Sequence, residues 1–465
     1  MTLESPVELL NRAASAVPER CAYRFGDLEV SYAEAAATAA RVTEELHEMG
    51  ASGRAVVLFL PNSPEIAILA FAVQSAGAML CTVNPAYTSR ELSLVLGDAD
   101  PAAIFCFESE TATVATAMPE GSRAKVIVLS QQTQTWLSPG HEMRLLEVPS
   151  PETVCTLQYT GGTSGRPKGV LLSHKAVAAN IEQREAVLPT DRGDERVLCC
   201  MPLFHVFAQS MALHLTAYAQ GTLTILPRYR PDWTLEAMTQ DRITRFPAGP
   251  TVFNGLLAFE GFENTEFSSL KCAFSGSAPL PRATLERWRQ TTGTEIYEGY
   301  GQTEAGPILT FNGPAAPVRP GTVGKPVAAT EIRLVDPADP SCPVPDGEPG
   351  EIIARGPQIM SGYLNLPEET VSALRDGWLH TGDIGRFDEE GYLIIEDRKK
   401  GMVLVGGFNV YPREIDEVLM THPHVVEAAV VGRPDAYRGE TLHAFVVVAK
   451  GSDTDAAALE AYCRE

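Results

Sequence analysis

The chain has 465 residues and a formal net charge of −22, with 45% hydrophobic and 21% charged residues. Its length predicts two or more domains with sizeable apolar cores, and its negative charge argues against nonspecific binding to nucleic acid or to an anionic membrane. No cationic and apolar leader pattern opens the sequence, and the longest apolar runs, residues 55–60 and 66–73, are too short to span a bilayer.

The first helices are marked by their ends. Ser31 and Glu34 have the spacing of a capping box that opens an alanine-rich helix, and Gly50 has the position of a helix-ending glycine. Ser63 and Pro64 have the N-cap and first helical positions of a second helix. The sequence therefore predicts two helices, which begin near residues 32 and 64.

Apolar runs alternate with these helices. Buried strands are predicted for three of these runs, residues 55–60, 79–83 and 102–107. The next segment, residues 111–152, has a less regular pattern and is predicted to be a peripheral connection. The β–α–β order predicts a parallel, doubly wound sheet and therefore an α/β fold.

A stretch rich in glycine and hydroxyl groups, residues 159–169, follows a strand predicted at residues 153–159. Glycines let several backbone N–H groups face one anion, threonine and serine add hydroxyl donors, and Lys168 adds a charge suited to phosphate. A short strand predicted at residues 170–172 completes a strand–loop–strand phosphate clasp. The helix-opening loop of kinases and GTPases is excluded, because Gly169 rather than Ser or Thr follows Lys168. A flexible surface loop is the alternative.

Three stretches in the middle of the chain are rich in apolar or small residues. Residues 201–208 are apolar apart from His205, and a lone histidine of this kind is more typical of a core than of a ligand contact. Residues 246–253 predict a strand end that leads into a helix. Residues 275–281 are small and precede a helix, so they either let a flat ring lie against the backbone or form a tight turn.

Residues 297–304 combine two glycines around an aromatic residue with a hydroxyl and a carboxylate. Mg²⁺ takes one or two protein carboxylates alongside substrate phosphates. Glu304 can supply such an oxygen, Thr303 can hydrogen-bond a phosphate, and Tyr300 offers a face to adenine. A solvated charged loop is the alternative.

Polar residues recur in the last third of the chain. Asp383, at the end of residues 377–383, can accept two hydrogen bonds from a vicinal diol such as that of a ribose. Residues 397–400 form a charge run, which on its own indicates a solvated face. A small α+β unit is predicted from Pro412 as a helix start, strands at residues 425–431 and 442–448, and a helix at residues 455–464.

Nine cysteines are scattered along the chain without a CxxC spacing, and Cys199 and Cys200 are adjacent. This pattern indicates neither a zinc site nor a disulfide framework. Reduced thiols and a cytoplasmic location are therefore expected.

Taken together, residues 159–169, 297–304, 350–365 and 377–415 resemble motifs of the adenylate-forming superfamily of acyl-CoA synthetases, aryl-CoA ligases, luciferases and peptide-synthetase adenylation domains. The resemblance covers nearly the whole chain, and bacterial long-chain fatty acid–CoA ligases are the most similar subgroup. It implies a large N-terminal domain of doubly wound sheets and a distorted β-barrel, and a small mobile α+β domain. The implied boundaries are residues 1–396 and 397–465, with a hinge at Lys400.

The resemblance also implies site residues. The expected catalytic residues are Lys168, His205, Thr303 and Glu304, and the expected Mg²⁺ ligands are Glu304 and Thr160. The expected ATP-binding residues are Thr160, Gly161, Gly162, Thr163, Ser164, Gly165, Gly276, Ser277, Ala278, Glu298, Gly299, Tyr300, Gly301, Gln302, Thr303, Asp383, Ile395 and Arg398. The expected acyl pocket comprises His205, Val206, Phe207, Met211, Gly249, Phe253 and Ile308, and the expected CoA contacts are Gly406, Gly407 and Phe408.

The implied reaction uses ATP and Mg²⁺ to convert a medium- or long-chain fatty acid to acyl-AMP, releases pyrophosphate, and transfers the acyl group to CoA. The pocket candidates are apolar and offer no cation for a second carboxylate, which disfavours malonate-like acids. Alternatives are an aryl acid such as hydroxycinnamate or benzoate, loading of a carrier protein, and nucleotide binding with weak turnover. The expected partners are the acid, ATP and CoA, and a homodimer is left open.

The family's small domain continues beyond the position of Glu465 and ends near a P-x-x-x-x-G-K motif, whose lysine reaches the acyl carboxylate and the α-phosphate. No Gly-Lys in that context follows Lys400, since Lys450 and Gly451 are in the reverse order. Removal of a charge aimed at a transition state costs orders of magnitude in rate. A chain of this length is therefore expected to bind ATP, to adenylate poorly, and to convert supplied acyl-AMP and CoA relatively better.

Overall fold

A computed structural model describes residues 3–130, 137, 143–161, 167–398, 403–405, 408–410, 412–435, 439–452 and 454–463. Contacts divide the chain into two units, Met1–Thr330 with Arg355–Gly377 and Glu331–Ala354 with Trp378–Glu465. The expected boundary between residues 396 and 397 falls inside strand β21 (Leu393–Arg398) of the second unit, whose last residues pair with strand β20 (Trp378–Phe387). A division of the domains at residue 396 stays a prediction.

The first unit contains a seven-stranded sheet. Its strands, in spatial order, are β18 (Gly362–Tyr363), β8 (Lys168–Ser173), β7 (Val154–Thr160), β4 (Met79–Thr82), β3 (Ala55–Phe59), β5 (Ala103–Phe107) and β6 (Lys125–Leu129). The five strands from β7 to β6 are parallel, whereas β8 and β18 pair antiparallel at one edge. The predicted strands and the α/β class are confirmed.

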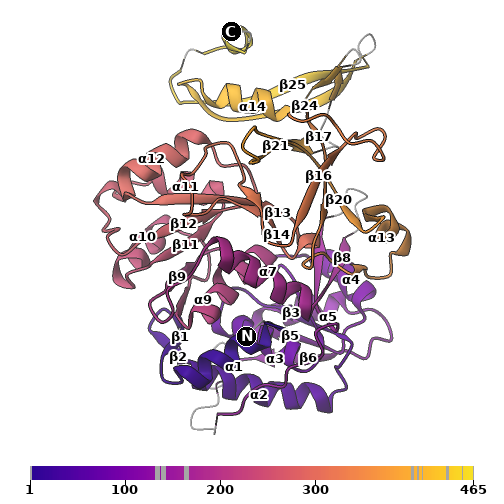
Figure 1. The fold of residues 1–465 in the computed structure, drawn as a ribbon. Helices are drawn as coiled ribbons and strands as arrows, with labels where there is room; N and C mark the ends of the chain where they lie inside the picture. Colours follow the sequence, from indigo (N-terminus) through magenta and orange to yellow (C-terminus); the bar gives the residue numbers. More distant parts are fainter. Residues whose placement is uncertain are drawn as a thin grey trace. The chain divides into compact units, whose positions relative to one another are not determined.

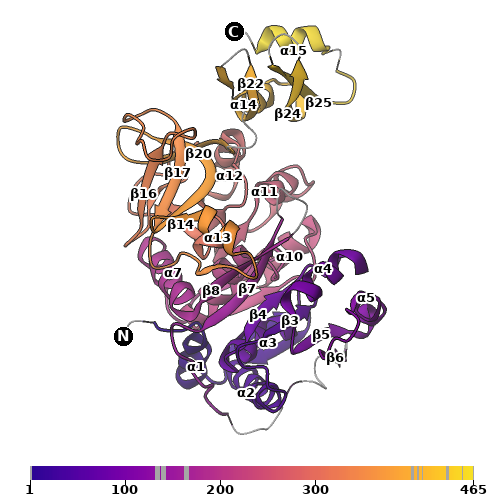
Figure 2. The same ribbon diagram turned by 90° about the vertical axis from the view of Figure 1, so that its right-hand side faces the viewer.

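Helices cover both faces of this sheet. Figure 2 shows α2 (Tyr32–Glu48) and α3 (Pro64–Ser75) together on one side of β3 and β5, with α4 (Ser89–Ala99) and α5 (Thr111–Ala117) on the other. Alternate residues of β3 pack with α4 and α5, since successive strand side chains point to opposite faces. All twelve residues of α3 are buried. The doubly wound arrangement is therefore confirmed.

The predicted helix ends are present. The Ser31 hydroxyl accepts from the backbone N–H of Glu34, and the Glu34 carboxylate accepts from the N–H of Ser31, as a capping box requires. Gly50 has φ of 67°, which a glycine adopts without strain after a helix. Ser63 precedes α3 but makes no capping bond with its side chain.

The expectation of an irregular connection across residues 111–152 is wrong in part. Helix α5 and strand β6 lie within it, and β6 extends the sheet by five parallel pairs with β5, from Ala103–Lys125 to Phe107–Leu129. The strand was missed because Val126 and Val128 are exposed on the edge of the sheet, so its pattern is not that of a buried strand.

The second large sheet of this unit has nine strands. In spatial order they are β15 (Lys325–Pro326), β14 (Ile308–Phe311), β13 (Glu295–Gly301), β12 (Cys272–Ser275), β11 (Arg245–Ala248), β9 (Arg196–Cys199), β10 (Thr222–Ile225), β1 (Cys21–Phe25) and β2 (Leu28–Ser31). Strands β13 to β1 are parallel, and β14, β15 and β2 extend the two edges antiparallel.

One apolar core lies beneath this sheet. Figure 1 shows α10 (Pro231–Gln240), α11 (Pro250–Leu257) and α12 (Arg282–Thr292) beside β11 and β12. Trp288 of α12 is fully buried and its ring contacts those of Phe246 and Phe253. Other helices among the described residues of the unit are α1 (Val7–Ala16), α7 (His174–Val187), α8 (Val206–Ala208), a π-helix (Gln209–His214), α9 (Leu215–Ala219), α13 (Pro367–Ala373) and the short 3₁₀ turns Glu108–Glu110, Phe262–Asn264 and Thr303–Ala305.

The second unit contains two smaller sheets. One includes β16 (Glu331–Val335), β17 (Gly350–Arg355), β20 and β21, and the other has the order β23 (Phe408–Val410), β22 (Val403–Val405), β25 (Gly439–Val448) and β24 (Val425–Asp435). The β24–β25 ladder packs with α14 (Pro412–Met420) and α15 (Ala456–Tyr462) around a small core of Leu419, Val430 and Leu459. The predicted small α+β unit is confirmed.

All nine cysteines are reduced. Cys342 and Cys463 are exposed and Cys21 is half-buried, whereas the other six are buried: Cys81, Cys106, Cys155, Cys199, Cys200 and Cys272. Across the described ranges, no helix combines the length and apolarity needed to cross a membrane.

Candidate functional site

The phosphate clasp predicted at residues 159–169 is built on an antiparallel hairpin. Strand β7 ends at Thr160 and β8 begins at Lys168, and these two residues are paired across the ladder. Gly161, which leaves the hairpin, is exposed with open space around its α-carbon. The two predicted strands are confirmed, while Gly162, Thr163, Ser164 and Gly165 of the connection lie outside the described residues.

Lys168 lies next to a tyrosine that connects it to Glu304. The Lys168 Nζ is 4.9 Å from the centre of the Tyr363 ring, within the range of a cation–π contact. The Tyr363 hydroxyl donates to Oε1 of Glu304 at 2.8 Å. The structure thus brings the predicted phosphate lysine over the ring face and the predicted metal ligand to the hydroxyl of one side chain. Sequence reasoning missed Tyr363, although it lies in the stretch 350–365 that carried part of the resemblance.

Burial and then the charge of Glu304 raise the pKa of Tyr363 well above its usual range. The phenol therefore stays protonated at neutral pH and remains a donor. Glu304 is half-buried, and its hydrogen-bond partner Tyr363 is an uncharged phenol. Such a carboxylate has the chemistry of a Mg²⁺ ligand, because hard cations prefer charged oxygen.

The backbone around Glu304 is fixed by buried polar side chains. Met360 donates its N–H to the Glu304 carbonyl at 2.9 Å. The Asn180 side chain of α7 exchanges two hydrogen bonds with the backbone N–H and carbonyl of Ile308. The Gln358 side chain also donates to the Ile308 carbonyl. Three separate segments are therefore tied together beside the carboxylate.

Glycines in the predicted adenine stretch have a packing reason. A Cβ on Gly299 would lie 2.3 Å from the Phe311 ring, and one on Gly301 would lie 1.8 Å from the Pro307 carbonyl oxygen. These two glycines allow β13 to approach β14. Glu298 is buried and accepts from the N–H of Leu280 at 3.0 Å, so it holds the end of the loop at residues 275–281.

That loop also lies against the predicted acyl pocket. A Cβ on Gly276 would lie 2.9 Å from the Phe207 ring, so the glycine lets this ring approach the backbone. Ser277 has φ of 70°, in the left-handed region, and both Ser277 and Ala278 are exposed. A Cβ on Gly249 would lie 4.0 Å from the Gly276 carbonyl oxygen, so this glycine has room for a small side chain.

The remaining candidates are distributed as follows. Tyr300 and Gln302 are half-buried, as are Thr303 and Thr160. His205 is exposed and its ring is tilted against Phe204, whereas Met211, Phe253 and Ile308 are buried. Phe253 is part of the core around Trp288, which is packing rather than pocket lining.

Val206 lines an internal cavity of about 10 Å³, room for about one water molecule. The cavity is also lined by Gln209, Ser210 and His214 of the π-helix and by Gly306. The Ser210 hydroxyl and the His214 Nδ1 are buried and have no hydrogen-bond partner among the residues that the structure describes. Burial, and next the charge of Arg184, lowers the pKa of His214 to about 3, so this ring is neutral.

In the second unit, two of the predicted ATP-binding residues are cross-strand neighbours. Asp383 of β20 pairs with Arg398 of β21, and the Arg398 Nε is 3.5 Å from Oδ1 of Asp383. Asp383 is buried and the Arg398 side chain is 80% exposed. Ile395, also on β21, pairs with Gly385. Lys400, Gly406, Gly407 and the side chain of Phe408 lie outside the described residues.

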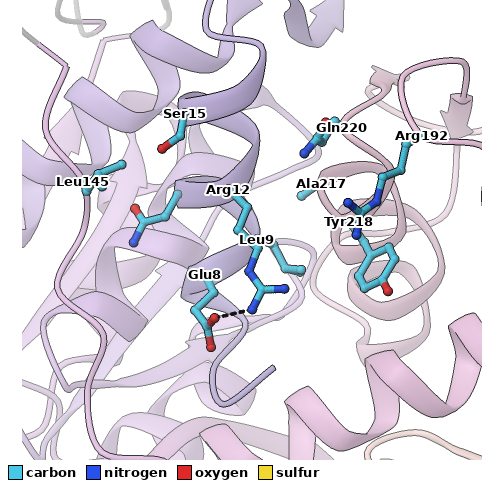
Figure 3. Close-up of a pocket in the computed structure, with 10 residues that line it drawn as sticks. Glu8, Leu9, Arg12, Ser15, Leu145, Arg192, Ala217, Tyr218 and Gln220 are labelled. Carbon is cyan, nitrogen blue, oxygen red and sulfur yellow. Dashed lines mark hydrogen bonds and ion pairs between the residues drawn. The ribbon is translucent and has the colours of Figure 1, made fainter. Parts of the chain in front are cut away.

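A larger cavity lies away from all of these residues. It has a volume of about 590 Å³ and is open to solvent, between α1 and the end of α9. Figure 3 shows Arg12, paired with Glu8, and Arg192 beside the Tyr218 ring. No predicted site residue lines it.

Known proteins identify the class. The α/β fold superimposes on ATP-bound MatB from Rhodopseudomonas palustris with a TM-score of 0.91 at 31% identity, covering 98% of this chain and 92% of that one. A long-chain-fatty-acid–CoA ligase of Bacillus subtilis strain 168 is 34% identical over 498 residues, 100% of this chain and 88% of the relative. A feruloyl-CoA synthase of an Amycolatopsis species is 34% identical over 462 residues, 97% of this chain and 90% of the relative. The fold and these relatives define an adenylate-forming acyl-CoA ligase, an acid–thiol ligase.

The chain belongs to the AMP-binding enzyme family, whose model matches residues 10–364 and whose C-terminal domain model matches residues 414–465. ATP and CoA are substrates of this ligase family. The predicted superfamily and enzyme class are confirmed, whereas the roles of individual residues stay predictions.

Proposed function

We propose that the protein activates a medium- or long-chain fatty acid with ATP and transfers the acyl group to CoA. In the first step a carboxylate oxygen bonds to the α-phosphorus of ATP while the bond to the β-phosphate oxygen breaks and pyrophosphate leaves. In the second, the CoA thiol sulfur, its proton lost, bonds to the acyl carbon and AMP leaves. The observation that carries the proposal is the position of Lys168 and Glu304 beside the phosphate hairpin.

Each residue has a distinct part in the first step. Lys168 and the N–H and hydroxyl groups of the hairpin loop bind the phosphates, and Thr303 adds a further hydroxyl. Glu304, assisted by Thr160, would hold Mg²⁺, which would neutralise phosphate charge. Positioning and charge neutralisation suffice for this chemistry, so no nucleophilic side chain is required.

Asp383 is proposed as a ribose contact, Arg398 as a contact of the ribose or a phosphate, and His205 as a residue that orients the acid. The proposed domains comprise residues 1–396 and 397–465, and a hinge at Lys400, close to their boundary, would let one chain carry out both steps. Gly406 and Gly407 would then lie near CoA.

Support for an aliphatic acid comes from the relatives named long-chain-fatty-acid–CoA ligase and from the apolar side chains of Met211 and Ile308. A second candidate, an aryl acid, is favoured by the buried hydroxyl and imidazole of Ser210 and His214, which could bond a polar ring substituent. The feruloyl-CoA synthase relative supports the same alternative.

The test is pyrophosphate release with acetate, octanoate, palmitate and ferulate, with and without CoA. Each buried methylene contributes about 0.8 kcal/mol, so kcat/KM should rise roughly fourfold per methylene until the pocket ends. A preference for acetate would overturn the proposal. A preference for ferulate that Ser210→Ala abolishes would replace it with the aryl acid.

A further inference from the structure

Tyr363 is held rigidly at the edge of the seven-stranded sheet. Its backbone pairs with Val170 of β8, and its N–H donates to the Thr370 hydroxyl at 2.9 Å. That hydroxyl in turn donates to the carbonyl of Leu366 at the start of α13. The strand pairing and the contact with the start of α13 thus both fix the position of the Tyr363 backbone.

The phenol lies between two groups of opposite charge. Its hydroxyl donates to Glu304 at 2.8 Å, and its ring faces the Lys168 ammonium at 4.9 Å. No ion pair between Lys168 and Glu304 is recorded among the described residues, although both contact the same side chain. A direct pair would neutralise the two charges that phosphate and metal binding require.

From this arrangement we infer that Tyr363 is a positioning residue that keeps Lys168 and Glu304 separate and oriented before the nucleotide binds. The inference rests on the proposed roles of Lys168 and Glu304. The hydroxyl fixes the rotamer of the carboxylate while it leaves the negative charge in place, because a neutral donor does not cancel it. The ring stabilises the ammonium through its face, which leaves the N–H groups of the lysine able to turn toward phosphate.

Two substitutions separate these functions. Tyr363→Phe removes the hydroxyl and keeps the ring, whereas Tyr363→Leu removes both. The control is Tyr32→Phe, because the buried Tyr32 hydroxyl also donates a hydrogen bond, to the Gly221 carbonyl at 2.9 Å. Tyr32 begins α2 and its hydroxyl contacts the backbone just before β10, so the substitution leaves β7, β8 and β18 unchanged.

The first measurement is calorimetric ATP binding across a Mg²⁺ titration, alongside pyrophosphate release. Tyr363→Phe is expected to raise the Mg²⁺ concentration at half-maximal binding about tenfold, the effect of a lost hydrogen bond to a charged group. ATP affinity without Mg²⁺ and the KM of the fatty acid should not change. Tyr32→Phe should lower thermal stability comparably and leave the Mg²⁺ midpoint unchanged.

The second measurement is competitive acetylation of the Lys168 amine, read by mass spectrometry. Tyr363→Leu is expected to slow this acetylation several-fold, because the ammonium then pairs with Glu304, and Glu304→Ala in the same chain should restore it.

The results distinguish this inference from the proposed function. A Mg²⁺ midpoint that moves in Glu304→Ala but not in Tyr363→Phe would overturn the role of Tyr363 alone. An unmoved midpoint in Glu304→Ala would overturn the metal role of Glu304. Unchanged acetylation in Tyr363→Leu would show that the tyrosine does not keep the two charges apart.

Discussion

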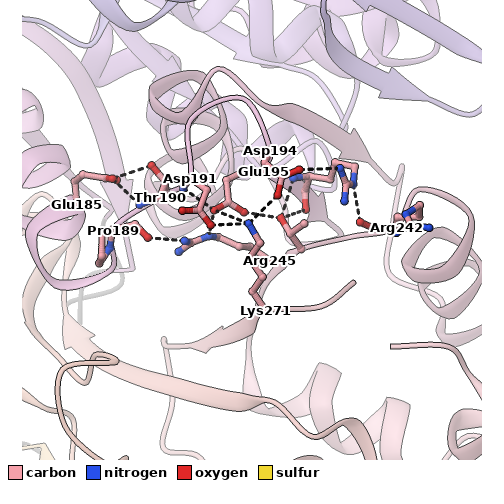
Figure 4. A network of polar contacts seen from close by, with 11 residues as sticks. Glu185, Pro189, Thr190, Asp191, Asp194, Glu195, Arg242, Arg245 and Lys271 are labelled. Carbon is pink, nitrogen blue, oxygen red and sulfur yellow. Dashed lines mark hydrogen bonds and ion pairs between the residues drawn. The ribbon is translucent and has the colours of Figure 1, made fainter. Parts of the chain in front are cut away.

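Two carboxylates of the first unit, Glu195 and Glu304, have opposite environments. Glu195 is 1% exposed and lies in the polar network of Figure 4. Its Oε1 is 2.9 Å from Arg245 Nε and accepts from the Asp191 N–H, while its Oε2 accepts from the Thr244 hydroxyl at 2.6 Å. Glu304 is half-buried, and its recorded partner among the described residues is the neutral Tyr363.

The difference shows how to separate a structural charge from a binding one. The charge of Glu195 is balanced within the fold by Arg245, whose other end donates to the Pro189 carbonyl. Glu304 is oriented but not neutralised, so its charge is left for a ligand. Removal of Glu195 should therefore affect stability, and removal of Glu304 should affect chemistry.

The largest expected effect is on stability. Glu195→Ala leaves Arg245 buried without its carboxylate, which costs about 3–5 kcal/mol of unfolding free energy. Urea unfolding measures it, with Glu45→Ala as the control, because the exposed Arg41–Glu45 pair contributes at most about 1 kcal/mol. A loss for Glu195→Ala no greater than that of Glu45→Ala would break the comparison.

The next effect is on catalysis. Lys168→Ala and Glu304→Ala should each lower pyrophosphate release by roughly 10²–10³, because each removes one charge aimed at the reacting phosphates. Their unfolding free energies should stay within about 1 kcal/mol of the original protein, since neither group balances a buried charge. Unchanged kinetics in Glu304→Ala would remove this residue from the site.

A smaller effect on stability is expected from Lys271, which lies at the exposed side of the Glu195 network. Lys271 contacts the exposed carboxylates of Asp191 and Asp194, and the hydrogen bonds it donates lower the pKa of both. A carboxyl group with a lowered pKa stabilises the fold above its unfolded pKa of about 3.9, and this stabilisation is lost as the pH falls through the folded pKa. Lys271→Met should therefore cost at most about 1 kcal/mol at pH 7.

That cost should fall toward zero in acid, as the two carboxyl groups become protonated. Urea midpoints of Lys271→Met and the original protein at pH 7 and near pH 3 test it. A difference that grows on acidification would contradict the assigned ion pairs.

Local signals predicted much of the fold. The capping box of Ser31 and Glu34 and the left-handed Gly50 depend on neighbours within four residues, so sequence alone defines them. The β7–β8 hairpin is local in the same sense, and it places Lys168 opposite Thr160. Resemblance to a known family supplied the rest of the site list.

Features that depend on distant pairing were not predictable from pattern. Tyr363 contacts Lys168 and Glu304 because the two-residue strand β18 pairs with β8, which is distant in the sequence, with Tyr363 opposite Val170. Gly301 is predicted as an ATP-binding residue, and the structure adds a packing reason for it, because a Cβ there would collide with the Pro307 carbonyl oxygen. Strand β6 is exposed at its edge and shows no buried pattern.

The distribution of thiols has a practical consequence. Burial raises the pKa of Cys106 and Cys272 to about 11, and the thiolate is the form that alkylating reagents attack. The six buried cysteines all belong to the first unit, whereas Cys342 and Cys463 are exposed in the second. A short pulse of iodoacetamide should therefore mark Cys342 and Cys463 at once, and the six buried cysteines of the first unit only when it opens. Mass spectrometry of the individual cysteine peptides would then measure the rate at which the first unit opens, and no engineered cysteine is needed.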